Sequence, residues 1–219
     1  MDINFITDSI PIFIKAGGVT LVVGIWAIIF SLVIGIVCSV AIHFKIPIAG
    51  MIAKAYIELS RNTPSLIQLF FLYYGLPKAG ITLSAQTCAI AALSFLGGSY
   101  MTEAFRSGIE TVSRSQIESA QSIALNPVQI FCHVVLPQSL VTALPFLSSN
   151  AIFLLKETSI VSAVALEDLT FTAKDIIGTV YKSNESLFML VVSYLIILLP
   201  AIIALSIAEK KVRAIGLGR

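Results

Sequence analysis

Long runs without a charged residue restrict the fold of this chain more than any other feature. A helix needs about 20 apolar residues to cross a bilayer, and the runs Val19–Ala41 and Leu187–Ala208 are both long enough. Only 12% of the 219 residues are charged and 57% are apolar, whereas a typical soluble domain carries about 25% charge. The sequence therefore indicates an all-α integral membrane protein, folded as a single domain over residues 1–219. Its acidic N-terminus lacks the basic start of a cleavable signal peptide.

About five transmembrane helices are expected from these runs. The predicted spans are Val19–Ala41, a second span ending at Leu76, Ile81–Phe105, Val141–Leu166 and Leu187–Ala208. The uncharged part of the second span, Asn62–Leu76, is short, so this span must include residues before Glu58.

The lysines and arginines near the span ends predict an orientation, because cytoplasmic loops carry an excess of them. With a cytoplasmic C-terminus, the inside set is Lys45, Lys54, Arg106, Arg114, Lys210, Lys211, Arg213 and Arg219. The outside set is Lys15, Lys78, Lys174 and Lys182. Eight against four favours an outside N-terminus and a cytoplasmic C-terminus.

The stretch "YIELSRNTPSLIQLFFLYYGLP" places charged side chains at the start of an apolar run. Glu58 and Arg61 are three residues apart, so we expect them to share a helical face and partly neutralise each other. Thr63 and Pro64 offer an N-cap and a first helical residue, which predicts a helix broken after about Leu59 and restarted at Pro64. A helix start inside a membrane protein can hold anionic groups.

Two interpretations of this stretch remain open. In the first, Glu58, Arg61, Asn62 and Thr63 line the path of a small polar substrate, since charges in membrane spans are costly and usually functional. In the second, the charges form an internal ion pair, or the junction lies at the cytoplasmic membrane surface.

A second candidate is "FLLKETS" in the fourth predicted span, which holds Lys156, Glu157 and Thr158. Adjacent helical residues point about 100° apart, so Lys156 and Glu157 are not simply partners. One can face the segment of Glu58 and Arg61, and the other a cavity or a second subunit. The alternative is a snorkelling lysine beside a structural glutamate.

The predicted cytoplasmic segment 106–137 is the largest loop. In "ALNPVQIF", Asn126 can cap a helix, Pro127 fits its first position, and Gln129 can complete a capping box. We therefore expect helix, turn and helix in this loop rather than a slack linker.

The chain lacks the residue patterns that several classes of function require. No G-x-x-x-x-G-K-[ST] motif occurs, so ATP phosphates cannot be bound in that manner. Cys38, Cys88 and Cys132 have no metal-ligand spacing and are expected to be small buried hydrophobes, and His43 and His133 are far apart. We expect no catalytic residue, no metal site and no nucleic-acid partner. A gradient-driven porter or channel is an alternative, because such proteins often pair charges within the membrane.

The sequence resembles the permease subunits of bacterial ABC importers of the polar amino acid uptake class. Their EAA signature is matched by "ESAQSIALNPVQIFCHVVLPQSL", with Glu118, Ala120 and the pair Leu136-Pro137 in place. Ser119 replaces the usual Ala, and Ala124 the usual Gly. Because Ala does not easily adopt a positive φ, we expect a different turn here, built by Asn126 and Pro127.

Three further blocks resemble narrower motifs of the same class, and the resemblance covers about residues 16–210. These blocks are "SRNTPSLIQLFFLYYGLP", "GGSYMTEAFRSGIETV", with Gly98 where Ala is common, and "LLKETSIVSAV".

The resemblance implies a type I ABC importer transmembrane domain in the bacterial cytoplasmic (inner) membrane. It implies a dimer with the same or a similar permease chain, an ABC ATPase that binds ATP, and a periplasmic or lipid-anchored solute-binding protein. In some members of this class, residues of the second and fourth spans hold the substrate, and Glu58, Arg61 and Glu157 are the matching residues in this chain. The transported solute is expected to be an amino acid, or alternatively another small polar solute.

The resemblance also makes the 106–137 loop the coupling element that docks on the ATPase. The expected coupling residues are Glu118, Ser119, Ala120, Ile123, Ala124, Leu125 and Asn126. Ala120, Ile123 and Leu125 can form an apolar contact face. Glu118 can meet a basic rim of the ATPase, or favour the N-terminus of its own helix.

Overall fold

The computed structural model describes residues 1–216, and these residues form helices and short connections without any strand. The α-helices are α1 (Ile3–His43), α2 (Pro47–Arg61), α3 (Ser65–Phe70), α4 (Ala85–Glu110), α5 (Arg114–Ser122), α6 (Pro127–Ile130), α7 (Leu136–Glu157), α8 (Leu169–Val180) and α9 (Ser183–Gly216). Two π-helical turns, η1 (Phe71–Gly75) and η3 (Phe131–Val135), and two 3₁₀ segments, η2 (Leu76–Ala79) and η4 (Thr158–Val164), complete the list.

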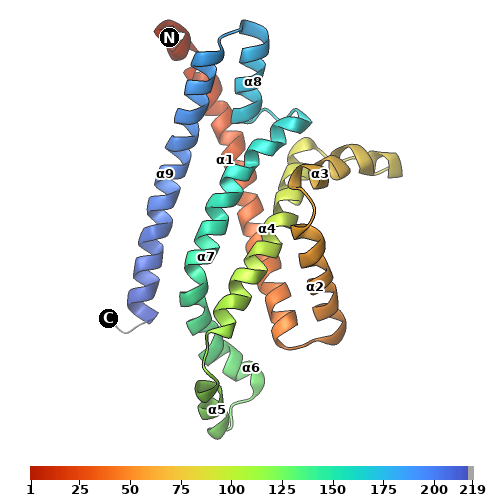
Figure 1. Ribbon diagram of the computed structural model, residues 1–219, viewed down its shortest axis with the longest axis vertical. Coiled ribbons are helices and arrows are strands. Elements are labelled where there is room, and N and C mark those ends of the chain that lie inside the picture. Colours follow the sequence, from red (N-terminus) through yellow and green to blue (C-terminus); the bar gives the residue numbers. More distant parts are fainter. Residues whose placement is uncertain (217–219) are drawn as a thin grey trace.

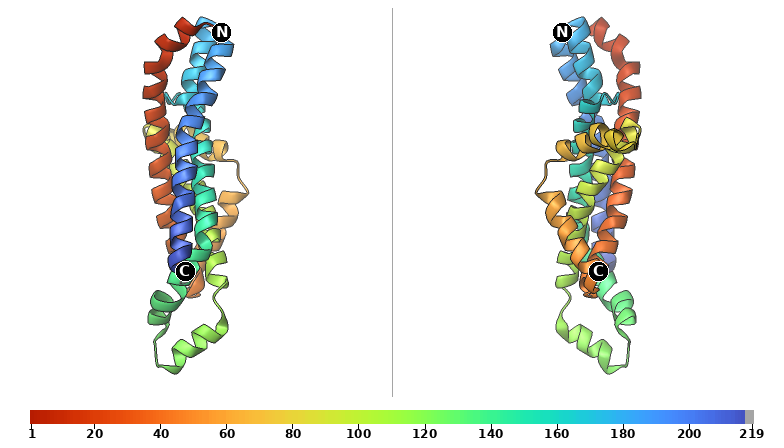
Figure 2. Two further views of the ribbon diagram at one scale, coloured as in Figure 1. Left: turned by 90° about the vertical axis from the view of Figure 1, so that its left-hand side faces the viewer. Right: turned by 90° about the vertical axis from the view of Figure 1, so that its right-hand side faces the viewer.

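Four long helices, α1, α4, α7 and α9, form an elongated bundle (Figure 1). α1 packs on α4, α4 on α7, and α7 on α9. The N-terminus and α8 lie at one end of the bundle, while α5, α6 and the end of α9 lie toward the other (Figures 1 and 2). The loop of α5 and α6 extends beyond the bundle at that second end (Figure 2).

The predicted all-helical fold is confirmed, but the span boundaries shift. Three helical stretches are long and apolar enough to cross a membrane: Ile3–His43, Pro127–Val164 and Ser183–Ala214. The first begins well before the predicted Val19. α4 has 26 residues and is therefore about 39 Å long at 1.5 Å per residue, but it starts at Ala85 rather than Ile81. Arg219, counted in the inside set, lies outside the described residues.

Side-chain caps fix where several helices begin. Asp2 accepts a hydrogen bond from the Phe5 amide before α1, and Ser84 accepts one from the Thr87 amide before α4. Each cap satisfies an amide that has no partner within its own helix. Asp2 Oδ2 also lies 2.9 Å from Lys182 Nζ, which ties the start of α1 to the residue before α9.

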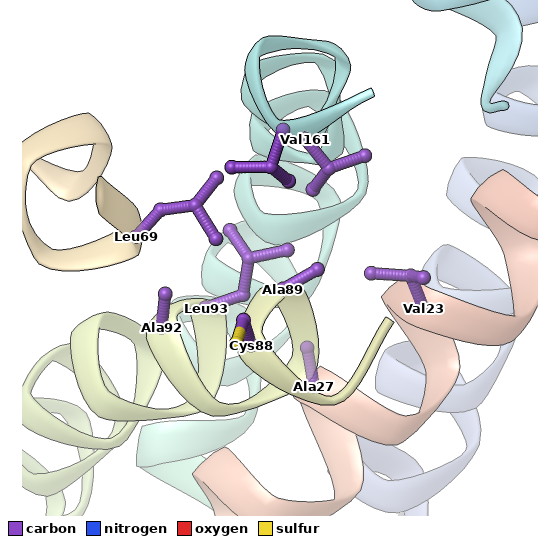
Figure 3. Close-up of a cluster of buried hydrophobic side chains, with 9 residues drawn as sticks. Val23, Ala27, Leu69, Cys88, Ala89, Ala92, Leu93 and Val161 are labelled. Atoms are coloured by element: carbon purple, nitrogen blue, oxygen red, sulfur yellow. The ribbon is translucent and has the colours of Figure 1, made fainter. Parts of the chain in front are cut away.

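Small side chains allow the central helices to approach closely. A cluster of fully buried residues from α1, α3, α4 and η4 is shown in Figure 3: Val23, Ala27, Leu69, Cys88, Ala89, Ala92, Leu93, Val161 and Val164. A Cβ atom on Gly108 of α4 would collide with the backbone oxygen of Ser139 in α7. α4 therefore needs glycine at this crossing.

Two sequence expectations need correction. Of the three cysteines, Cys88 is buried as expected, but Cys38 is only half-buried and Cys132 is exposed. α8 was not predicted, because its residues follow a span and include Lys174 and Asp175, which suit a loop on sequence alone. In the structure it packs against α1 and α9 through buried Leu169 and Ala173.

Candidate functional site

The predicted break in the second span is present and lies at residues 62–64. α2 ends at Arg61, and Pro64 has extended backbone angles, φ −60° and ψ 135°, directly before α3. Pro64 itself occupies the cap position, so the predicted N-cap role of Thr63 is wrong. Instead, the Thr63 hydroxyl donates a hydrogen bond to the Leu59 carbonyl. α3 has six residues and continues directly into η1 and η2, so the helical backbone that begins at Ser65 runs on to Ala79.

One side chain bridges the break. The Gln68 amide group donates hydrogen bonds to the Ser60 carbonyl (3.0 Å), the Thr63 carbonyl (3.1 Å) and the Thr63 hydroxyl (2.8 Å). These carbonyls lie where the helix is interrupted and have lost their usual backbone donors. Gln68 therefore joins the end of α2 to α3.

Glu58 and Arg61 do not pair with each other, contrary to the sequence expectation. A Glu58 carboxylate oxygen accepts a hydrogen bond from the Asn62 side chain at 3.1 Å. Arg61 points toward α4, where its Nη1 atom lies 3.8 Å from Glu103 Oε2 and its guanidinium carbon lies 5.4 Å from the centre of the Tyr100 ring. The reason is tertiary: α4 offers Arg61 both a carboxylate and an aromatic face.

Glu157 faces α3, as expected for one of the two charges in the fourth span. Its Oε1 atom accepts a hydrogen bond from the Ser65 hydroxyl at the start of α3. Lys156 is exposed and has no ion-pair partner within residues 1–216, whereas Glu157 is half-buried. Thr158 is fully buried and donates its hydroxyl to the Leu155 carbonyl, so its hydroxyl does not face the exposed side.

The segments of Arg61 and Glu157 are connected through α4 and α7. Asn150 donates a hydrogen bond to the Tyr100 carbonyl at 3.2 Å, and the Tyr100 ring meets the Phe153 ring edge-on at 5.6 Å between centroids. Phe153 lies four residues before Glu157 and so on the same helical face. We refer to the set Arg61, Ser65, Tyr100, Asn150 and Glu157 as the polar patch.

Sequence reasoning missed three members of the polar patch: Ser65, Tyr100 and Asn150. Helical spacing could have indicated two of them, Tyr100 and Asn150. Tyr100 and Glu103 are three residues apart, and Asn150 lies seven residues before Glu157, which places each pair on one helical face. The structure leaves Glu58 and Asn62 exposed beside the patch, and Thr63 in the break.

The 106–137 loop has the predicted helix, turn and helix. Asn126 accepts a hydrogen bond from the Gln129 amide, and the Gln129 side chain accepts one from the Asn126 amide, both at 2.9 Å. This capping box confirms the expected start of α6. The expectation of a different turn at Ala124 is wrong, because Ala124 adopts a left-handed conformation with φ 61°. The protein accepts backbone strain there instead of using another turn.

The predicted apolar contact face of the loop also needs correction. Ala120 is buried in a cluster with Ile130, Phe131 and Val135, and Leu125 packs on that cluster. Both side chains pack within the loop: Ala120 is buried and Leu125 is half-buried, so neither forms the fully exposed face that was expected. Ile123 is 72% exposed. Glu118 and Ser119 are exposed on α5, and Ala124 and Asn126 are exposed in the turn that follows Ile123.

A fully buried carboxyl lies away from the polar patch, after the candidate span that ends at Val164. Asp168 is fully buried, and its Oδ1 atom caps α8 by accepting a hydrogen bond from the Phe171 amide at 2.8 Å. Its Oδ2 atom has no hydrogen-bond partner among residues 1–216. Burial, partly opposed by the hydrogen bond from the Phe171 amide, raises the pKa of Asp168 to about 6.

A metal centre is not assembled by the described residues. Within residues 1–216 no three His, Cys, Asp or Glu side chains come together in a way that could hold a metal ion.

Comparison with known proteins agrees with this architecture. The profile of the family described as "Binding-protein-dependent transport system inner membrane component" matches residues 31–214. The probable amino-acid ABC transporter permease protein PatM of Vibrio harveyi is 30% identical over 88% of each chain. The L-cystine transport system permease protein TcyL of Bacillus subtilis is 30% identical over 97% of this chain and 92% of its own.

A solved structure extends the similarity to three dimensions. The crystal structure of an amino acid ABC transporter with histidines superposes with a TM-score of 0.89 at 29% identity, over 96% of this chain and 99% of the other. The chain therefore belongs to the family of inner membrane components of binding-protein-dependent ABC transporters: it is a multi-pass permease subunit rather than an enzyme, and it works with an ATPase and a binding protein.

Proposed function

We propose that this chain is the membrane-spanning permease subunit of an ATP-driven importer of amino acids. The observation that carries the proposal is the TM-score of 0.89 with an amino acid ABC transporter, over nearly the whole of both chains. PatM and TcyL, whose names also specify amino acids or cystine, support it.

In this proposal the chain crosses the inner membrane five times as a type I importer domain. α1, the broken pair α2 and α3, α4, α7 and α9 provide the crossings. Lys45 follows α1, Arg114 begins α5, and Lys210 lies near the end of α9, and these segments lie toward the same end of the bundle (Figure 1). The excess of basic residues at this end supports a cytoplasmic C-terminus and an outside N-terminus.

The protruding 106–137 loop is proposed to dock on the ATPase. It extends beyond the bundle at the proposed cytoplasmic end (Figure 2), and its exposed tip carries Ile123 next to the strained Ala124. Glu118 on the exposed side of α5 can meet a basic rim. ATP is bound by the partner, and its hydrolysis moves the loop and rocks the helices around the substrate path.

The polar patch is proposed to line the substrate path. An amino acid carries a carboxylate and an ammonium group, and the patch offers one group for each. Arg61 suits a carboxylate, because its planar guanidinium can donate two parallel hydrogen bonds. Glu157 suits an ammonium, because its only side-chain partner among the described residues is the neutral Ser65.

A second permease subunit is proposed to cover this side of the chain. Glu58, Arg61 and Lys156 are exposed in segments assigned to the membrane, where contact of charged groups with lipid costs several kcal/mol. A facing subunit that encloses a water-filled path removes that cost. The partner can be another copy of this chain or a similar one.

Uptake by reconstituted transporter tests the proposal. The permease is purified with its ATPase and second permease subunit, placed in proteoliposomes, and supplied with the binding protein and ATP. Labelled amino acids with acidic, basic, amide and sulfur-containing side chains are offered in turn. ATP-dependent uptake of one group is expected. If no amino acid enters while the ATPase is active and another small polar solute does, the amino acid assignment is wrong.

A further inference from the structure

A row of alternating charges starts at Arg61, the last residue of α2, and continues along one face of α4. Glu103 Oε2 lies 3.8 Å from Arg61 Nη1 and 3.1 Å from Arg106 Nη2. Arg106 Nε in turn lies 3.5 Å from Glu110 Oε1. Residues three or four positions apart share a helical face, so Tyr100, Glu103, Arg106 and Glu110 form a continuous strip. The strip reaches the last residue of α4, directly before the 106–137 loop turns into α5.

Arg61 is attracted to this strip without using its hydrogen-bond donors. A guanidinium group has five N–H donors, and the Arg61 side chain makes no hydrogen bond with any other residue in the described part of the chain. Its 3.8 Å separation from Glu103 exceeds the roughly 2.7–2.9 Å of a charge-assisted hydrogen bond. Its contact with Tyr100 uses the face of the ring. The donors of Arg61 therefore stay available for an anionic ligand.

No other carboxylate of the described chain holds Arg61. Glu58 is three residues away on the same helix, but its carboxylate accepts a hydrogen bond from Asn62. Glu157 accepts one from Ser65. Glu103 is the described carboxylate within 4 Å of the Arg61 guanidinium.

We propose that Glu103 is a positioning residue that keeps the Arg61 guanidinium over Tyr100, with its donors free to receive the substrate carboxylate. This inference rests on the proposed function, in which Arg61 lines the substrate path. Glu103 would also repel a carboxylate, but Arg106 at 3.1 Å compensates its charge. The two arginines and two glutamates of the row sum to zero charge, so the row adds no net charge that would repel a carboxylate.

A chemical test of this role needs no substrate. The assembled complex with the ATPase is treated with phenylglyoxal, which reacts selectively with arginine, and modification of Arg61 is followed by mass spectrometry. In Glu103→Gln, Arg61 should react about threefold faster, as expected for loss of a partly exposed ion pair. Glu110→Gln is the matched control. It removes an equal charge from the same face of α4, but Glu110 pairs with Arg106 and not with Arg61. The rate at which Arg61 reacts should therefore not change.

Equal Arg61 rates in Glu103→Gln and the wild type would overturn the proposal. If Glu103→Gln does not assemble, Glu103→Asp replaces it. Its shorter side chain keeps the charge but moves it away from Arg61. We therefore expect Arg61 to react at a rate between that in the wild type and that of free arginine. An unchanged rate overturns the proposal.

Transport kinetics give the second readout. Glu103→Gln should raise KM for the amino acid taken up by the wild type by about threefold, with the maximal rate nearly unchanged, and Glu110→Gln should leave KM as it is. A lower KM would mean that Glu103 mainly repels the substrate, against the proposal. If labelling behaves as expected but the wild-type complex transports no amino acid, the proposed function fails while the positioning of Arg61 by Glu103 stands.

Discussion

Ser65 at the start of α3 donates a hydrogen bond to Glu157 at the end of α7, although the two residues are 92 positions apart in the chain. The bond joins the two segments in which charged residues interrupt apolar runs. It also leaves Glu157 with a neutral partner, which is the basis of the first prediction.

Replacing Glu157 with Gln should weaken substrate binding. The Gln side-chain oxygen can still accept the Ser65 hydrogen bond, so the substitution removes charge and little else. We expect KM for uptake to rise at least about tenfold, the scale for losing a charge-assisted hydrogen bond. The control is Glu167→Gln, an exposed glutamate 3.7 Å from Lys15. Unchanged kinetics in Glu157→Gln for every transported amino acid would reduce Glu157 to a structural role.

Replacing Ile123 with Glu should uncouple the permease from its ATPase. Ile123 is the exposed apolar residue at the tip of the 106–137 loop, and a charge there would have to be buried in the docked complex. We expect uptake to fall at least about tenfold and co-purification of the ATPase to weaken, with membrane insertion intact. Val128→Glu is the control, because Val128 is also exposed on this loop. An equal loss in both variants would argue against a specific role of Ile123.

Replacing Ala124 with Gly should stabilise the protein without impairing transport. Ala124 has φ 61°, a conformation that costs a residue with a Cβ atom roughly 1 kcal/mol. Gly removes this cost. We expect the melting temperature in detergent to rise by about 2–4 °C. A lower melting temperature would show that the turn does not store this strain.

Replacing Gly108 with Ala should destabilise the protein. The new methyl group would collide with the Ser139 backbone oxygen and approach Ala143, and overpacking typically costs about 1–3 kcal/mol. Gly178→Ala in α8 is the matched control, since nothing lies within 4 Å of a Cβ atom there. Thermal unfolding in detergent compares the two. A melting temperature of Gly108→Ala at or above that of Gly178→Ala would contradict the close approach of α4 and α7.

Asp168 should make the protein more stable at pH 5 than at pH 8. Its pKa of about 6 lies above the ordinary 3.8, so between these two pKa values the folded chain binds a proton that the unfolded chain does not. Stability from this group therefore falls as pH rises through about 6 and is lost above that pH. Asp168→Asn keeps an N-cap oxygen but cannot titrate, and it should flatten the pH dependence of the melting temperature. An unaltered pH profile in this variant would assign the dependence to other groups.

Local sequence rules predicted the features that depend on neighbours in the chain. Proline disfavours a helical conformation in the residue before it, and the second span breaks at Pro64. Asn126, Pro127 and Gln129 stand at fixed spacing, and they form the expected capping box. In both places the backbone chemistry of three or four residues decides the outcome.

Features that depend on packing between helices were missed. Sequence spacing paired Arg61 with Glu58, but α4 supplies Glu103 and Tyr100, which no local rule relates to Arg61. Ala120 and Leu125 looked like an exposed face because the cluster that buries them comes from η3 and α6. Ala124 shows a third limit: a residue preference predicts which conformation is costly, but the rest of the loop can impose that conformation.

The three hydrogen bonds of Gln68 have a mechanical consequence. In a broken helix without such bonds, the two helical segments could move independently of each other. Because the Gln68 amide on α3 is bonded to Ser60 in α2 and to Thr63 in the break, the angle between α2 and α3 is restrained. A displacement of α2 would then carry α3 with it, together with Ser65 and its hydrogen bond to Glu157.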